Sequence, residues 1–220
     1  MSTISAVLTG DLIESSNAEP DAVERAMRIL SATADSIAGW QGPPTDTRFT
    51  RFRGDGWQMM LSANPELALR AAIVLQASLR AAGPTPGTRI AIGLGHVDHF
   101  GSKDLSDARG TAFERSGQTL DSMGRTRRLT LAAPGLSPLA DIIFDLIDER
   151  MTRWTPEQAE AAALYLLPDN PTLAAIAGPL AISPQAVSYR LGGAGGARLR
   201  KSLSDWEDEL RTSELDKVAP

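Results

Sequence analysis

The sequence contains no cysteine and only two histidines. It therefore cannot form disulfides, thiolate nucleophiles, cysteine-ligated zinc sites or a histidine-rich metal site, so any metal must be held by carboxylates. It has no run of about 18 apolar residues, and its N-terminus lacks the basic start of a secretion signal. We therefore expect no membrane partner and a cytoplasmic location. The 220 residues are 42% hydrophobic and 5% aromatic, which suits one large or two small folded domains.

The charge distribution is uneven. A net charge of −5 argues against non-specific nucleic-acid binding by the chain as a whole. One window departs from this balance, because residues 170–204 carry four basic and no acidic residues between two acidic segments. Both chance spacing of surface charge and a local nucleic-acid contact explain such a window.

The N-terminal half predicts the order strand, helix, strand, strand, helix, strand. Apolar residues recur at helical spacing over residues 20–38, and alternating residues flank a Gly-Asp-Gly turn at 54–56. Asp21 and Glu24 are expected to form a capping box on the first helix, and Asn64 to cap the second. This order is typical of a ferredoxin-like α+β domain, an antiparallel sheet with both helices on one face. The first strand then lies between the third and the fourth.

This topology brings two aspartates to one corner of the sheet. Asp11 ends the first strand, and Asp55 lies in the turn between the second and third, so we expect them about one or two strand spacings of 4.8 Å apart. Carboxylates beside Gly10, Gly54 and Gly56 suit divalent cations that bridge phosphate oxygens. A purely structural interpretation, in which Asp11 caps and Asp55 turns the chain, stays open.

Four segments resemble the class III nucleotidyl cyclase homology domain, and more closely the bacterial SatD-like family, which joins such a domain to a C-terminal helix-turn-helix. These segments are TGDLIESS at 9–16, RFRGDGW at 51–57, RIAIGLGHV at 89–97 and GTAFERSGQTLDSMG at 110–124. The resemblance implies that Asp11 and Asp55 bind Mg²⁺ or Mn²⁺ together with a nucleotide. It implies nucleotide-binding roles for Ser15, Ser16, Arg51 and Gly54, with Arg51 in place of the purine-reading lysine of cyclases.

The segment at 110–124 departs from the cyclase pattern. Cyclases carry an asparagine and an arginine where this sequence has Glu114 and Gln118. Replacing the cation removes transition-state stabilisation that is typically worth about 3–4 kcal/mol per donor. We therefore expect a domain that binds nucleotide and metal but no longer cyclises, and so a protein that is not an enzyme.

The C-terminal part has the spacing of a helix-turn-helix. Thr155 and Gln158 predict a capping box, Ala177 is small enough for a close helix crossing, and Ser183 with Pro184 begins the recognition helix. The residues expected to contact DNA are Ser183, Gln185, Ser188, Tyr189, Arg190, Arg198, Arg200 and Lys201.

Two features fit this pattern poorly. Pro179 follows Gly178 within the first helix, and four glycines lie between residues 192 and 196. A helical bundle used for dimerisation therefore remains a rival interpretation of the C-terminal part.

These observations predict a two-domain α+β protein, with a cyclase-like domain at 1–136, a linking helix at 137–153 and a helix-turn-helix domain at 154–220. The predicted function is a homodimeric transcriptional regulator that binds double-stranded DNA and senses a nucleotide with a divalent metal. The alternatives are an active magnesium- or manganese-dependent nucleotidyl cyclase or related phosphate-transfer enzyme, and a scaffold that binds only protein.

Overall fold

The computed structural model describes residues 4–43, 47–52 and 54–212. Its centre is a five-stranded sheet in the order β2-β3-β1-β4-β5. The strands are β1 (Ile4–Leu12), β2 (Thr50–Phe52), β3 (Gly56–Leu61), β4 (Thr88–His96) and β5 (Leu129–Ala132). As predicted, β1 lies between β3 and β4 and pairs antiparallel with both.

The fifth strand corrects the expectation of a wholly antiparallel sheet. β5 pairs parallel with β4, so the sheet is mixed and not antiparallel throughout. The sequence does not predict β5, because a strand of four residues is too short to show a strand period. The fold remains α+β.

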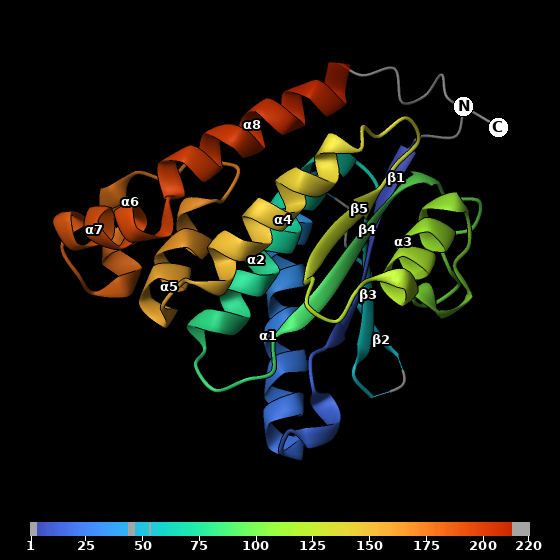
Figure 1. Ribbon diagram of the computed structural model, residues 1–220, viewed down its shortest axis with the longest axis horizontal. Helices are drawn as coiled ribbons and strands as arrows, with labels where there is room; N and C mark the ends of the chain where they lie inside the picture. The colour runs from blue at the N-terminus through green and yellow to red at the C-terminus, as the bar shows by residue number, and fades with distance from the viewer. Residues whose placement is uncertain (1–3, 44–46, 53, 213–220) are drawn as a thin grey trace.

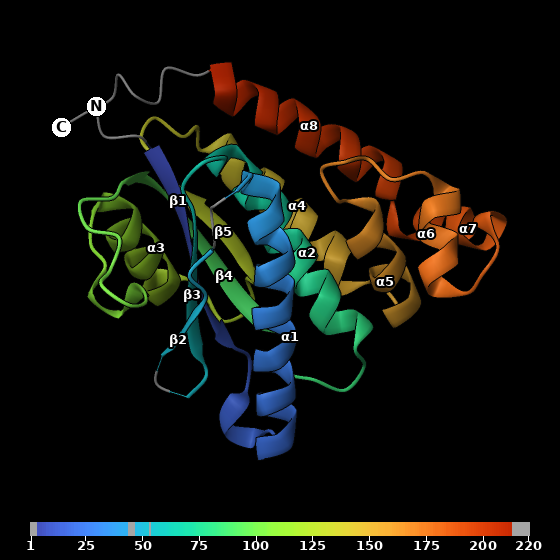
Figure 2. The same ribbon diagram turned by 180° about the vertical axis from the view of Figure 1, so that it is seen from behind.

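Helices cover both faces of the sheet. α1 (Pro20–Ala38) and α2 (Ala68–Ala81) lie together on one face, and α3 (Thr111–Ser122) lies on the other (Figures 1 and 2). The glycines of β4 allow α3 to approach closely, because a Cβ on Gly93 would lie 2.3 Å from the carbonyl oxygen of Ala112. Short 3₁₀ turns occur at Ser15–Asn17, Gly39–Gln41, Pro65–Leu67 and Leu105–Asp107.

Two predicted helix caps are wrong. α1 begins at Pro20 after Glu19, without a side-chain cap, because Glu24 pairs with Arg51 instead of closing a capping box. Asn64 precedes the 3₁₀ turn before α2, but its side-chain amide donates to the carbonyl of Trp40, 2.8 Å away. In both cases a partner distant in sequence takes the polar group.

The C-terminal part is entirely helical. It contains α4 (Leu139–Thr152), α5 (Pro156–Tyr165), α6 (Leu173–Leu180), α7 (Pro184–Ala194) and α8 (Gly196–Thr212). α5 to α7 lie beyond α2, and α8 crosses one end of this layer (Figures 1 and 2). The capping box of Thr155 and Gln158 is present, as predicted.

One hydrophobic cluster continues from the sheet into these helices. It includes Leu8 of β1, Leu75 of α2, Trp154 before α5 and Leu203 of α8, all almost fully buried. The predicted boundary between two domains at residue 153 therefore stays a prediction. Residues 1–3 of the first predicted domain and residues 213–220 of the last lie outside the described residues.

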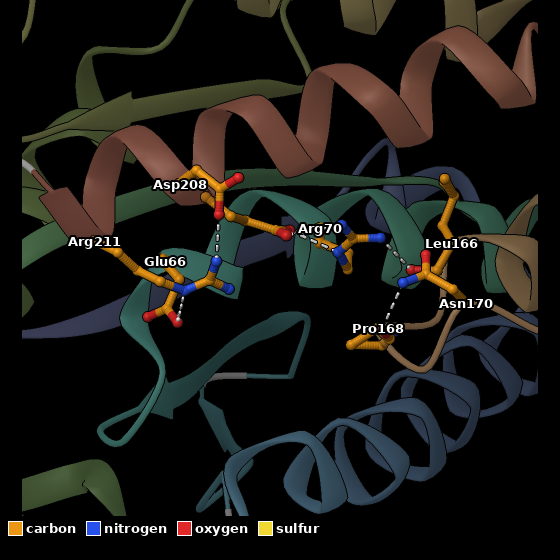
Figure 3. A network of polar contacts seen from close by, with 8 residues as sticks. Glu66, Arg70, Leu166, Pro168, Asn170, Asp208 and Arg211 are labelled. Atoms are coloured by element: carbon orange, nitrogen blue, oxygen red, sulfur yellow. Dashed lines mark hydrogen bonds and ion pairs between the residues drawn. The ribbon is translucent and has the colours of Figure 1, made fainter.

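A buried ion pair joins α2 to α8. The Arg70 guanidinium binds the Glu207 carboxylate at 2.6 and 2.8 Å, with side-chain exposures of 2% and 6%. A third donor of Arg70 bonds the carbonyl of Leu166 at 2.9 Å, and Arg211 of α8 bonds Glu66 nearby (Figure 3). These contacts attach α8 to α2 and to the turn before it, in the part of the chain that also contains the sheet.

The outward side of α4 is apolar. Four large aliphatic side chains at spacings of three and four are 44–66% exposed: Leu139, Ile142, Ile143 and Leu146. Among the described residues, no helix is long and apolar enough to cross a membrane.

Candidate functional site

Asp11 and Asp55 lie at the same corner of the sheet. Asp11 is opposite Gly56 in the β1–β3 register, and the amide of Leu12 donates to the carbonyl of Asp55 at 3.2 Å. The Ser15 hydroxyl donates to the Asp55 carboxylate, which ties the loop after β1 to the hairpin turn. The structure therefore brings these three predicted site residues together.

The Asp11 carboxylate is already paired. Arg89 lies opposite it in the β1–β4 register and bonds both carboxylate oxygens, with Nε–Oδ1 at 2.9 Å. The hydrogen bonds that Arg89 donates to Asp11 raise the pKa of Arg89. A divalent cation at Asp11 would have to displace this guanidinium. Because Arg89 occupies both oxygens of Asp11, the corner as it stands does not fit a metal ion. The described residues also contain no group of three or more histidine, aspartate or glutamate side chains that could hold one.

Arg51 lies on the opposite face of the sheet. It is registered with Trp57 and Gly10, one position away from Asp11, and successive side chains of a strand point to opposite faces. Its guanidinium pairs with Glu24 of α1 at 2.8 and 2.9 Å and donates to the carbonyl of Gly54. The hydrogen bonds that Arg51 donates to the Glu24 carboxylate lower the pKa of Glu24. Arg51 and Asp11 are thus not brought together, and Ser16 is exposed in the turn after β1.

A chain of uncharged polar groups extends from the hairpin to α3. The Gln58 amide donates to the Thr9 hydroxyl at 3.1 Å, and Thr9 bonds the Ser116 hydroxyl of α3 at 2.8 Å. Thr9 and Asp11 share one face of β1 because they are two residues apart. These groups were not predicted from the sequence. Polar residues at alternate positions near the end of an apolar strand, such as Thr9 and Asp11, could have indicated a polar site there. Glu114 and Gln118 are exposed on α3.

α6 and α7 are the two short helices that the sequence assigns to a helix-turn-helix. A three-residue turn joins them, in which Ala181 adopts the left-handed conformation with φ 52° and ψ 40°. The amide of Ile182 donates to the carbonyl of Ala177 at 3.2 Å, and the Ser183 hydroxyl caps α7 at the amide of Ala186. Ala177 and Val187 pack against Ala161 of α5 in one buried cluster. α6 continues through Pro179 to Leu180.

The residues predicted to contact DNA differ in their exposure and in their present partners. Ser183, Gln185, Ser188 and Tyr189 are exposed on α7, and Tyr189 is 86% exposed. Arg190 pairs with Glu160 at 2.8 Å, and Lys201 pairs with Asp205 at 2.5 Å.

The two remaining basic residues, both on α8, differ. Arg198 is exposed and has no hydrogen-bond or ion-pair partner among the described residues. Arg200 is turned inward, stacks 3.2 Å above the Tyr165 ring and donates to the carbonyl of that tyrosine. Of the four basic residues between positions 170 and 204, Arg200 therefore packs against the helices of the C-terminal part.

The described residues define an α+β protein with a mixed five-stranded sheet and a helical C-terminal part. No family model and no curated protein matches the chain.

Two solved structures that resemble it are cyclases. The guanylyl cyclase Cya2 aligns with 55% of this chain and 72% of its own, at 19% identity and a TM-score of 0.37. A bacterial light-regulated adenylyl cyclase aligns with 60% of this chain and 42% of its own, at 16% identity and a TM-score of 0.39. Both similarities are too distant to bear on function.

Proposed function

We propose that the protein is a DNA-binding transcriptional regulator. The observation that carries this proposal is the exposed side of α7, which follows a three-residue turn and presents Gln185, Ser188 and Tyr189 to solvent. Amide and hydroxyl groups at the start of such a helix read base edges in the major groove. The buried contacts of Ala177 and Val187 hold the opposite side of the helix against its neighbours.

The basic residues supply the phosphate contacts of this proposal. Arg198 needs no rearrangement, because it is exposed and unpaired among the described residues. The ion pairs of Arg190 and Lys201 are surface pairs, which contribute only about 0–1 kcal/mol each, so a DNA phosphate can replace the carboxylate. Arg200 supports the fold of the helical part and contributes to DNA binding through its charge.

The proposal also includes ligand sensing, in which the Asp11–Asp55 corner binds a nucleotide. It requires Arg89 and Ser15 to exchange their present partners for the ligand, and a metal only where Arg89 releases Asp11. Titration calorimetry with ATP and GTP, with and without magnesium, tests it, and no heat in any arm contradicts it. Formation of cyclic nucleotide in the same samples would favour the enzyme alternative.

DNA binding is tested with a labelled duplex of random sequence, about three helical turns long, by fluorescence anisotropy at several salt concentrations. Arg198→Ala should weaken binding and reduce the salt slope by about one unit, whereas Tyr189→Ala should weaken it without changing the slope. Arg153→Ala is the control, because Arg153 is a highly exposed arginine directly after α4 and outside α6 to α8. Absence of binding at low salt, or equal losses in all three variants, contradicts the proposal. Sedimentation of the same samples tests the predicted homodimer.

A further inference from the structure

A groove of about 630 Å³ lies where α6 begins, α7 ends and α8 begins. Its walls include Thr172, Ser188 and Gly192, and its basic side is formed by Arg198 and Arg200. It is separate from the Asp11–Asp55 corner and lies beside the exposed side of α7.

The electrostatics of this groove favour an anion. Two arginines line it, and none of its lining residues is acidic. α6 and α8 both begin at its wall, and the first amides of a helix carry a partial positive charge and lack intrahelical acceptors. One of these amides, on Ala175, is capped by the Thr172 hydroxyl, whereas α8 follows Gly195 without a capping side chain.

Arg200 carries a positive charge without an anionic partner in ion-pair distance among the described residues. Its guanidinium is held by the Tyr165 ring and by carbonyl oxygens, one of them on Pro171 at 3.4 Å. Its Nε is buried and has no hydrogen-bond acceptor in the part of the chain that the structure describes. Desolvation lowers the pKa of this arginine, so the surroundings disfavour its charge. A bound anion would compensate that cost.

Gly192 leaves the mouth of the groove open. It lies inside α7, where glycine is about 1 kcal/mol less favourable than alanine. Its φ is not positive, and a Cβ built on it would meet no atom within 4 Å, so neither backbone conformation nor packing requires glycine here. A glycine of this kind allows a ligand to approach the helix backbone closely.

We infer that this groove is a binding site for a phosphate group. The two guanidinium groups of α8 and the first amides of α6 and α8 suit a tetrahedral anion with several acceptor oxygens, more than a planar carboxylate. The phosphate belongs either to the backbone of bound DNA or to a free phosphorylated small molecule. The site itself does not depend on the proposed DNA binding.

The direct test is a titration of the ¹⁵N-labelled full chain with inorganic phosphate, at ionic strength held constant with sodium chloride. The amide signals of Gly195, Gly196 and Ala197 should shift and saturate, together with those of the first turn of α6. The amides of Gly117 and Gly124, which lie outside the groove, are internal references. Shifts that do not saturate, or that appear equally at the references, overturn the inference.

Two charge variants show that the phosphate is bound in the groove. Gly192→Asp places a carboxylate at its mouth, and Gly192→Asn places a neutral side chain of the same size there. Phosphate affinity should fall at least about tenfold more in Gly192→Asp than in Gly192→Asn. Arg198→Ala should lose affinity as well, whereas Arg153→Ala should not. Equal affinities in the aspartate and asparagine variants overturn the inference even if both fold normally.

A third experiment distinguishes the two sources of phosphate. If the duplex shifts the same amides and inorganic phosphate competes with it, the bound phosphate belongs to DNA. If phosphate binds but the duplex leaves these amides unchanged, the source is a small molecule, and the site stands while the proposed DNA binding fails.

Discussion

Asp11 and Arg89 face each other across the β1–β4 ladder and form a two-point ion pair at the corner where the sequence predicts a metal. Both side chains are about one quarter exposed, so the pair is partly shielded from water. The guanidinium thus neutralises a carboxylate that would otherwise attract a cation.

Removing this guanidinium should create cation affinity. Arg89→Gln frees both oxygens of Asp11 beside Asp55, and we expect it to bind Mn²⁺ at least about tenfold more tightly than the parent protein. Titration calorimetry measures the difference. The double variant Asp11→Asn with Arg89→Gln should lose the gain, and a parent that binds Mn²⁺ as tightly as Arg89→Gln would show that Arg89 does not block the corner.

Breaking the buried pair between α2 and α8 should destabilise the whole chain. Glu207→Ala leaves the Arg70 charge buried without its partner, which costs about 3–5 kcal/mol of unfolding free energy. Urea unfolding measures it. Replacing both residues, by Arg70→Met and Glu207→Leu, should cost less than Glu207→Ala alone.

The pair of Arg211 and Glu66 is the matched control, because it also joins α8 to the turn before α2 but its arginine is 49% exposed. Arg211→Ala should cost about 1 kcal/mol or less. Similar losses in Arg211→Ala and Glu207→Ala would show that burial does not govern the pair.

The turn between α6 and α7 should gain stability from glycine. Ala181 adopts a left-handed conformation that costs an L residue about 1–2 kcal/mol. Allowing for the greater flexibility of unfolded glycine, Ala181→Gly should raise the unfolding free energy by about 0.5–1 kcal/mol. Ala174→Gly, at an exposed position inside α6, should lower it by about 1 kcal/mol. A loss in both variants would contradict the turn conformation.

Asp148 should make stability depend on pH. It is buried on α4, and burial raises its pKa above the ordinary value of 3.8. As the pH rises above about 4, the unfolded chain releases this proton first, so ionisation favours unfolding until the raised pKa is passed. Asp148→Asn removes this effect, so its stability relative to the parent should increase with pH. Urea unfolding from pH 4 to 7 measures it, and a difference that is constant over this range would contradict the assignment.

The sequence predicted the parts of the fold that depend on local patterns. The periodicity of α1 and α2 and the hairpin turn placed β1 between β3 and β4 correctly. The cap of α7 was also predicted, because Ser183 and Pro184 act within one turn.

The errors concern partners that are distant in sequence. Glu24 was assigned to a cap, but Arg51 of β2 binds it. The ring of Tyr165 as the partner of Arg200 was not predicted, because the two residues are 35 positions apart. Arg89 gave no signal, because a strand residue reveals its function only once the neighbouring strand presents Asp11.

The attachment of α8 to α2 has a consequence for synthesis on the ribosome. Arg70 is translated 137 residues before Glu207, and the core residues Leu199 and Leu203 also lie on α8. Until they leave the exit tunnel, the apolar side of α2 and a bare guanidinium stay open to water. The nascent chain therefore cannot complete this core before α8 has left the tunnel, and a chain cut short before α8 keeps that surface uncovered.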